Sequence, residues 1–181
     1  MKYTLTNETR TTYDLARDII LHKIAYTEEF KKHILDKYDI ALEGGWLESE
    51  ENLSQDGDCF VKDDARVYGY AHVKDSAIVF GNAKIFGNAI VYGNAWIYGN
   101  AWVYGDAIVY GDAYVYEDAS VFGSASVHGD ARICGNAQIN QSVTCFCCIS
   151  TTVQWYEYQY TIAELNKKFS KERAEAGKWI K

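Results

Sequence analysis

Histidines and cysteines are the residues of this sequence whose types could do chemistry. A histidine can act as a general base or bind a metal, and a cysteine thiolate can attack an electrophile or bind zinc. His72 and His128 fall inside a long repetitive segment, whereas His22 and His33 precede it. A general base needs an orienting partner and a substrate pocket, and the sequence reveals neither around His72 or His128. We therefore assign no catalytic residue and interpret both histidines as surface residues.

The cysteines are odd in number, and three of them are crowded together as Cys145, Cys147 and Cys148. An odd, crowded set is a poor disulfide framework and indicates reduced thiols. Structural zinc sites usually have two separated cysteine pairs, and this group, even with Cys134, does not have that spacing. We expect these side chains to be small, buried apolar groups, with a zinc site as the alternative. No metal and no cofactor is predicted.

The composition excludes several classes of function. The 181 residues suit one domain with small caps, and 48% of them are hydrophobic, which is enough for a core. A net charge of −7 argues against direct nucleic-acid binding, because phosphate contacts need Lys and Arg. No apolar run approaches ~20 residues, and the polar start MKYTLTNETR lacks a signal-peptide core. The sequence therefore predicts a cytoplasmic protein without a membrane span.

A six-residue repeat organises the elements that must position any site. β-branched residues recur at every sixth position from Val61 to Ile139, and alanine follows each by four positions from Ala65 to Ala137, with Val143 continuing that series. The β-branched residue favours a short strand, and Gly followed by Asn or Asp favours a corner. Three hexapeptides would close a triangular coil of about 18 residues, and coils would stack about 4.8 Å apart as parallel strands.

The phase of V-Y-G-N-A-W, aliphatic first and small fifth, resembles the left-handed β-helix pattern. The wording GNAxVYGNA, together with GGWLESEENLSQDGDCFVKDDA at 44–65, resembles the YdcK-type β-solenoid proteins, many of them found in phages and prophages. This resemblance implies a mainly β fold: a left-handed parallel β-helix of about five coils. It says little about function, because one fold hosts many tasks.

Two enzyme classes share the β-helix fold. The hexapeptide-repeat acyltransferases generally use a histidine base near a subunit interface and often carry a protruding loop, but residues 61–143 contain no insertion. The γ-class carbonic anhydrases need three histidines around one metal. His72 and His128 would lie about three coils apart, roughly 15 Å along the axis, which is too far for one metal.

Outward positions of the middle coils are unusually apolar. The residues after each aliphatic form columns of Tyr and Phe, which can simply stabilise cross-strand pairing. Exposed Trp and Ile are harder to explain in this way, because extended apolar patches usually mark interfaces. We therefore predict an interface that consists of Trp96, Trp102, Ile78, Ile90, Ile108, Tyr98, Tyr104, Tyr110 and Tyr114.

The two ends are expected to cover the open coils. Residues 1–58 form an α+β cap, residues 59–150 the β-helix and residues 151–181 a C-terminal strand and helix. Propensity leaves residues 14–23 open between a helix and a strand at 19–26, and the resemblance favours the strand. A short helix is predicted from the cap residue Thr27 to Tyr38.

These features predict a non-enzymatic β-solenoid that binds a protein partner. The resemblance to phage proteins implies that the partner is a bacterial host protein. The chain would then act as a defence-system inhibitor, such as an anti-CRISPR-like protein. The free protein is expected to be a homo-oligomer, a trimer or a dimer. The alternatives are an acyltransferase that uses acyl-CoA and, third, a carbohydrate-binding scaffold.

Overall fold

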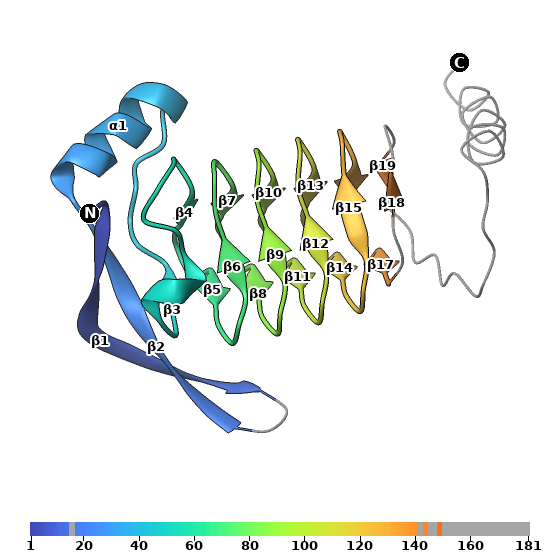
Figure 1. Ribbon diagram of the computed structural model, residues 1–181, viewed down its shortest axis with the longest axis horizontal. Helices are drawn as coiled ribbons and strands as arrows, with labels where there is room; N and C mark the ends of the chain where they lie inside the picture. Colours follow the sequence, from blue (N-terminus) through green and yellow to red (C-terminus); the bar gives the residue numbers. More distant parts are fainter. Residues whose placement is uncertain (15–16, 141–142, 145–147, 150–181) are drawn as a thin grey trace, which may run out of the picture.

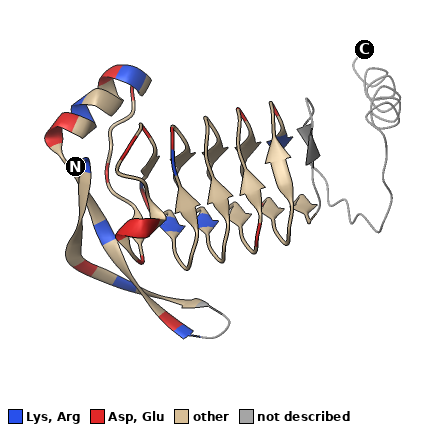
Figure 2. Ribbon diagram, in the orientation of Figure 1, with Lys and Arg blue, Asp and Glu red and all other residues tan. Residues whose placement is uncertain are grey.

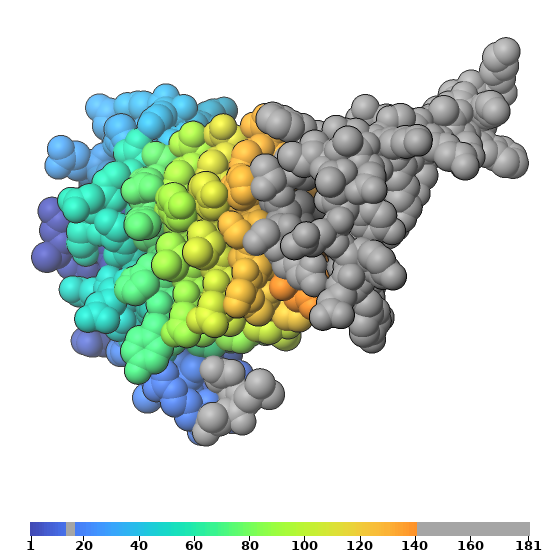
Figure 3. Space-filling view, turned by 45° about the vertical axis from the view of Figure 1, so that its right-hand side comes forward, coloured from blue at the N-terminus to red at the C-terminus, as the bar shows by residue number. Residues whose placement is uncertain are grey.

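The computed structural model describes residues 1–14, 17–140, 143–144 and 148–149. Its main body is a parallel β-solenoid of about five triangular turns, preceded by a β-hairpin and one helix (Figure 1). In the space-filling view successive turns stack from the N-terminal cap, in blue, to residue 140, in orange (Figure 3). The predicted solenoid of about five turns is confirmed.

Short strands build three sheets. The first sheet contains, in order, β1 (Tyr3–Asp14), β2 (Arg17–Tyr26), β3 (Trp46–Leu47), β5 (Arg66–Val67), β8 (Lys84–Ile85), β11 (Trp102–Val103), β14 (Ser120–Val121) and β17 (Gln138–Ile139). The second contains β4 (Phe60–Val61), β7 (Ile78–Val79), β10 (Trp96–Ile97), β13 (Tyr114–Val115), β16 (Arg132–Ile133) and β19 (Cys148–Ile149). The third contains β6 (His72–Val73), β9 (Ile90–Val91), β12 (Ile108–Val109), β15 (Ser126–His128) and β18 (Val143–Thr144).

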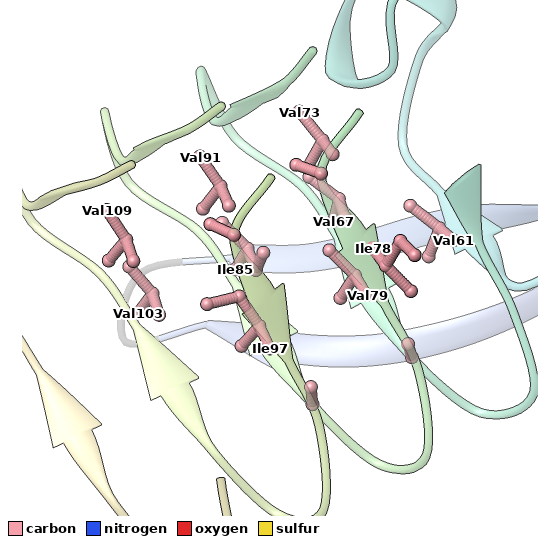
Figure 4. Close-up of a cluster of buried hydrophobic side chains, with 14 of the residues drawn as sticks. Val61, Val67, Val73, Ile78, Val79, Ile85, Val91, Ile97, Val103 and Val109 are labelled. Carbon is pink, nitrogen blue, oxygen red and sulfur yellow. The ribbon is translucent and has the colours of Figure 1, made fainter. Parts of the chain in front are cut away.

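The core is the inside of the triangle. The repeated Val, Ile and Ala side chains from residue 61 to residue 139 are at most 1% exposed. Figure 4 shows aliphatic side chains of successive coils directed toward one another in the interior. Burial of these apolar groups, at about 0.8 kcal/mol per CH₂, stabilises the solenoid together with its backbone ladders.

The corners need a left-handed backbone, which glycine adopts without steric cost. Gly99 has a φ of +71°, and the neighbouring Asn100 joins the next corner through a hydrogen bond to Asp118 of 2.9 Å. Three corners carry an acidic residue at the glycine position, and its carboxylate accepts a backbone N–H one coil later: Asp63 from Gly81, Asp75 from Gly93 and Glu117 from Gly135. Hydrogen bonds from side chains to side chains and to backbone thus connect successive corners.

The six-residue phase ends after Ile139. The sequence expectation places Val143 in the inward alanine series, but the structure pairs Val143 with Val127 on the neighbouring strand. The expectation for Val143 is therefore wrong. The physical reason is that the segment after Ile139, NQSV, lacks the Gly-Asn-Ala corner, so the chain reaches its next strand two residues early.

The N-terminal cap is a long hairpin followed by a helix. β1 and β2 pair antiparallel, which settles residues 17–26 as a strand. Helix α1 (Glu28–Tyr38) begins at Thr27, whose hydroxyl accepts the Phe30 N–H at 3.3 Å, as the cap prediction requires. β2 then pairs with β3, so parallel stacking starts at Trp46.

A 3₁₀ turn, η1 (Glu50–Asn52), completes the first coil. The buried Asn52 side chain donates to the carbonyls of Gly69 and Ala71 and so holds this coil on the next. The predicted C-terminal strand and helix at 151–181 lie outside the described residues. Within the described part, no helix has the length and apolarity to span a bilayer.

Candidate functional site: the aromatic outer faces

Each sheet presents an aromatic ladder outward, as the repeat predicts. The rings stack with centroid distances of 4.9–5.3 Å and interplanar angles of at most 20°. The ladders consist of Tyr68, Phe86, Tyr104 and Phe122 on the first sheet, Phe80, Tyr98 and Tyr116 on the second, and Tyr92, Tyr110 and His128 on the third. Tyr98, Tyr104 and Tyr110 therefore lie outside the triangle, half-buried by their neighbours.

The second sheet is partly covered by the cap, which corrects the prediction that Ile78 is exposed. Ile78 is 1% exposed and belongs to the buried cluster that includes Phe60 of the same column and Phe30, Ile34 and Leu42 of the cap. Figure 1 shows α1 and the chain after it lying over this end of the solenoid, beside β4. Because Ile78 is buried, it is not available to a partner.

Trp96 follows Ile78 in the same column, one coil further along, and is more accessible. Trp96 is half-buried, packs against the core cluster and lies 5.9 Å from the Tyr114 ring. Phe80 contacts Trp96 edge-on at 6.2 Å. Burial raises the pKa of the Tyr98 hydroxyl on the same sheet. Trp96 and Tyr114 thus offer a partly accessible apolar surface.

Side chains of the hairpin cover outward residues of the first coils. Ile19 and Leu21 of β2 form a second buried cluster with Trp46 and Tyr68, and Phe86 packs against its edge. The cations of Arg10 and Lys23 each lie 4.9 Å from the Trp46 ring centroid. These contacts fix the hairpin across the outer face of the first coils.

Beyond the hairpin the first sheet is open at Trp102. This side chain is 41% exposed, the largest exposure among the predicted interface residues. The Lys84 ammonium lies 4.6 Å from the Trp102 ring centroid, and Phe86 and Tyr104 contact the ring edge-on. Desolvation, followed by the charge of Arg66, lowers the pKa of Lys84. Arg66 and Lys84 lie on the strands β5 and β8, which pair with each other, and Figure 2 shows basic positions in blue on this part of the ribbon.

The third sheet is less aromatic. Ile90 and Ile108, both predicted interface residues, are half-buried on neighbouring strands. The Lys74 ammonium lies 5.0 Å from the Tyr92 ring centroid, which repeats the lysine-on-aromatic arrangement of Lys84 on another face. The predicted interface residues therefore divide among three faces and do not form one patch.

The residues that could do chemistry do not converge. His72 and His128 lie on β6 and β15 with two strands between them; His72 Nδ1 lies 2.7 Å from the Glu51 carbonyl oxygen, and His128 stacks on Tyr110. His22 lies in the hairpin, while His33 contacts Asp58 at 2.9 Å. Among the described residues, no group of three His, Cys, Asp or Glu side chains could hold a metal ion.

The cysteines are only partly described. Cys59 and Cys134 are buried, and neither is bridged to another described residue. The Lys2 ammonium lies 3.1 Å from the Cys59 sulfur; burial raises the pKa of Cys59, although Lys2 opposes this shift. Cys145, Cys147 and the side chain of Cys148 lie outside the described residues, as does any zinc site they would form.

Sequence reasoning missed Lys84 and Arg66. Like Trp102, each of them stands directly before an inward aliphatic residue. The parallel register pairs Arg66 on β5 with Lys84 on β8, and Lys84 with Trp102 on β11. Reading that column at a spacing of 18 residues would have found them. The sequence reasoning instead singled out aromatic and aliphatic residues and left the basic ones aside.

Comparison with known proteins identifies the repeat. The family model described as the YdcK β-solenoid repeat matches residues 83–99 and 95–111, the coils that carry Trp96 and Trp102. No curated protein matches the chain. The matched segments contain the Gly-Asn/Asp corners and inward Ala of the solenoid core. The chain is thus a β-solenoid, two segments of which match the YdcK β-solenoid repeat.

Proposed function

We propose that this protein is a non-enzymatic β-solenoid that binds another protein through its outer faces. The observation that carries the proposal is Trp102, a large aromatic side chain that is 41% exposed on the middle of the first sheet. The inward Val103 is fully buried and Trp102 adds nothing to that core. Exposed aromatic residues of this kind are typical anchors of protein interfaces.

The resemblance of the repeat to phage and prophage solenoids supports a specific setting for this binding. In that setting the protein is encoded by a phage or mobile element and acts in the cytoplasm of a bacterial cell. Its partner is a host protein, for example a component of a defence system. The outer apolar faces also support self-association, as a trimer or a dimer.

The test compares two variants that place the same charge on an exposed aromatic position. Trp102→Asp alters the open face of the first sheet, whereas Tyr70→Asp alters a corner residue that is 77% exposed. Oligomer mass is measured by light scattering, and partners are captured from bacterial lysate, identified and reconstituted as purified proteins. We expect Trp102→Asp to lose assembly or the reconstituted complex and Tyr70→Asp to retain both.

Folding of both variants is checked by circular dichroism, so that lost binding is not confused with unfolding. The proposal is overturned if Trp102→Asp retains both the oligomer and the complex. It is also overturned if the protein binds acetyl-CoA saturably near His72 or His128, which indicates an acyltransferase. Saturable glycan binding at the ladders without any protein partner indicates a carbohydrate-binding scaffold and likewise contradicts the proposal.

A further inference from the structure

We infer that the open part of the first sheet binds an extended, acidic peptide segment of the partner. The surface consists of Lys84, Phe86, Trp102 and Tyr104, with Arg66 at its border with the hairpin, and is here called the cationic–aromatic strip. This inference rests on the proposed function and specifies the chemistry of its partner. Three observations support it: the hairpin that occupies the neighbouring part of the face, the continuity of the ladder, and the charge of the strip.

The hairpin shows what this face accommodates. β2 pairs with β3 at His22 and Lys23, and in the part of β2 before this pairing Ile19 and Leu21 are 1% and 0% exposed, whereas Ile20 is 56% exposed. Ile19 and Leu21 pack on the aromatic side chains of Trp46 and Tyr68. The outer side of the first coils thus already accommodates alternate apolar side chains of an extended segment, which backbone pairing with β3 also holds.

The aromatic ladder continues past the hairpin without a change in geometry. Tyr68 stacks on Phe86 at 5.1 Å under the hairpin, and Phe86 stacks on Tyr104 at 4.9 Å beyond it. The exposure of Trp102 marks the place where cover by the hairpin has ended. The strip therefore repeats, one coil further along, the kind of aromatic surface that β2 occupies.

The charge of the strip sets the chemistry of the partner. Arg66 donates to the Thr12 hydroxyl at 3.4 Å, and Lys84 lies over Trp102. Within the described parts of the chain, neither cation forms an ion pair with a carboxylate, although Arg66 lies near enough to Asp64 to help lower the pKa of that carboxyl, after Arg10. A neutral or basic segment laid over Lys84 would bury uncompensated charge, whereas Glu or Asp side chains would supply charge-assisted hydrogen bonds.

A peptide fits this surface better than a nucleic acid does. A nucleic acid needs many cations to neutralise successive phosphates, and the whole chain carries a net charge of −7. Two cations beside aromatic rings are instead suited to a short segment in which acidic and apolar side chains alternate. Single-stranded DNA is included in the test as the competing polyanion.

The direct test uses a soluble synthetic peptide in which glutamate alternates with leucine, and a counterpart with lysine in place of glutamate. Binding of each peptide to the full chain is measured by isothermal titration calorimetry. We expect the glutamate peptide to bind and Lys84→Glu to weaken it by about tenfold, since the substitution replaces an attraction by a repulsion. Lys84→Glu is also expected to bind the lysine peptide more tightly than the native chain does.

The matched control is Lys74→Glu. Lys74 has the same arrangement over an aromatic ring, but it lies on the third sheet, and its substitution makes the same change in net charge. We expect Lys74→Glu to bind the glutamate peptide as the native chain does. Equal weakening by Lys74→Glu and Lys84→Glu would show a general charge effect and would overturn the inference.

Failure of this inference can be separated from failure of the proposed function. If a reconstituted partner is lost with Trp102→Asp but is unaffected by Lys84→Glu, the protein binds a partner without an acidic segment at the strip. Equal affinity for both peptides, or tighter binding of single-stranded DNA than of the glutamate peptide, also overturns the inference. If no peptide binds and Trp102→Asp changes neither assembly nor partner, both proposals fail.

Discussion

Replacement of Gly99 by alanine should destabilise the solenoid more than the same replacement of Gly69. Both glycines occupy corners with positive φ, +71° and +68°. A Cβ at residue 99 would lie 2.8 Å from the Glu117 backbone nitrogen, whereas a Cβ at residue 69 would lie 3.2 Å from the Gly87 backbone nitrogen and oxygen. The backbone conformation is the same at both positions, so the pair isolates the cost of the closer steric overlap.

The magnitudes follow from these two costs. A left-handed conformation costs an alanine about 1–2 kcal/mol, and this cost applies at both positions. Overlap with packed atoms adds about 1–3 kcal/mol, and it is more severe at Gly99, where backbone of the next coil lies 2.8 Å from the added Cβ. We expect Gly99→Ala to be less stable than Gly69→Ala by about 1 kcal/mol.

The assay is equilibrium urea unfolding followed by far-ultraviolet circular dichroism, with both variants at the same concentration and pH. The difference in unfolding free energy between them is the measured quantity. If Gly99→Ala and Gly69→Ala are equally stable to within about 0.5 kcal/mol, the closer approach of the next corner at Gly99 does not contribute to its need for glycine.

Two further predictions concern the cap. The Tyr26 hydroxyl donates to the Val61 carbonyl and accepts the Val61 N–H, each at 2.9 Å. Tyr26→Phe should therefore lower the unfolding free energy by about 1–3 kcal/mol. Tyr70→Phe, at an exposed position, should leave the urea midpoint unchanged. The hydrogen bond from Lys37 holds the pKa of Asp58 below its usual 3.8, so this contact stabilises the fold above that pH and is lost as the pH falls through the lowered value. Lys37→Ala should therefore lose less thermal stability than the native chain when the pH is lowered from 5 to 3, and an equal loss in both would contradict the assignment.

The frame of this protein could be predicted from the sequence because its determinants are local. Each inward Val or Ile and each Ala repeats the same environment, and the corner residues specify the same backbone turn in every hexapeptide. The helix after Thr27 was predictable for the same reason, since the hydroxyl that begins it is part of the segment.

The candidate site was predictable only in part, because exposure depends on what the cap covers. Ile78 and Trp96 occupy one column, yet Ile78, at the end of the solenoid next to the cap, is buried and Trp96 is half-buried. The repeat cannot specify which outward residues the side chains of β2 cover, and these side chains pack on the buried Tyr68 while Trp102 is exposed. These outcomes are set by contacts between distant segments.

The spacing of 18 residues between stacked corners has a consequence for how such a gene can change length. Removal or duplication of one hexapeptide would shift every later side chain to the next side of the triangle and scramble the columns. Removal or duplication of a whole coil would change the rod by about 4.8 Å and leave every column in order. The length of the rod is therefore quantised, and binding surfaces can be lengthened or shortened without being redesigned.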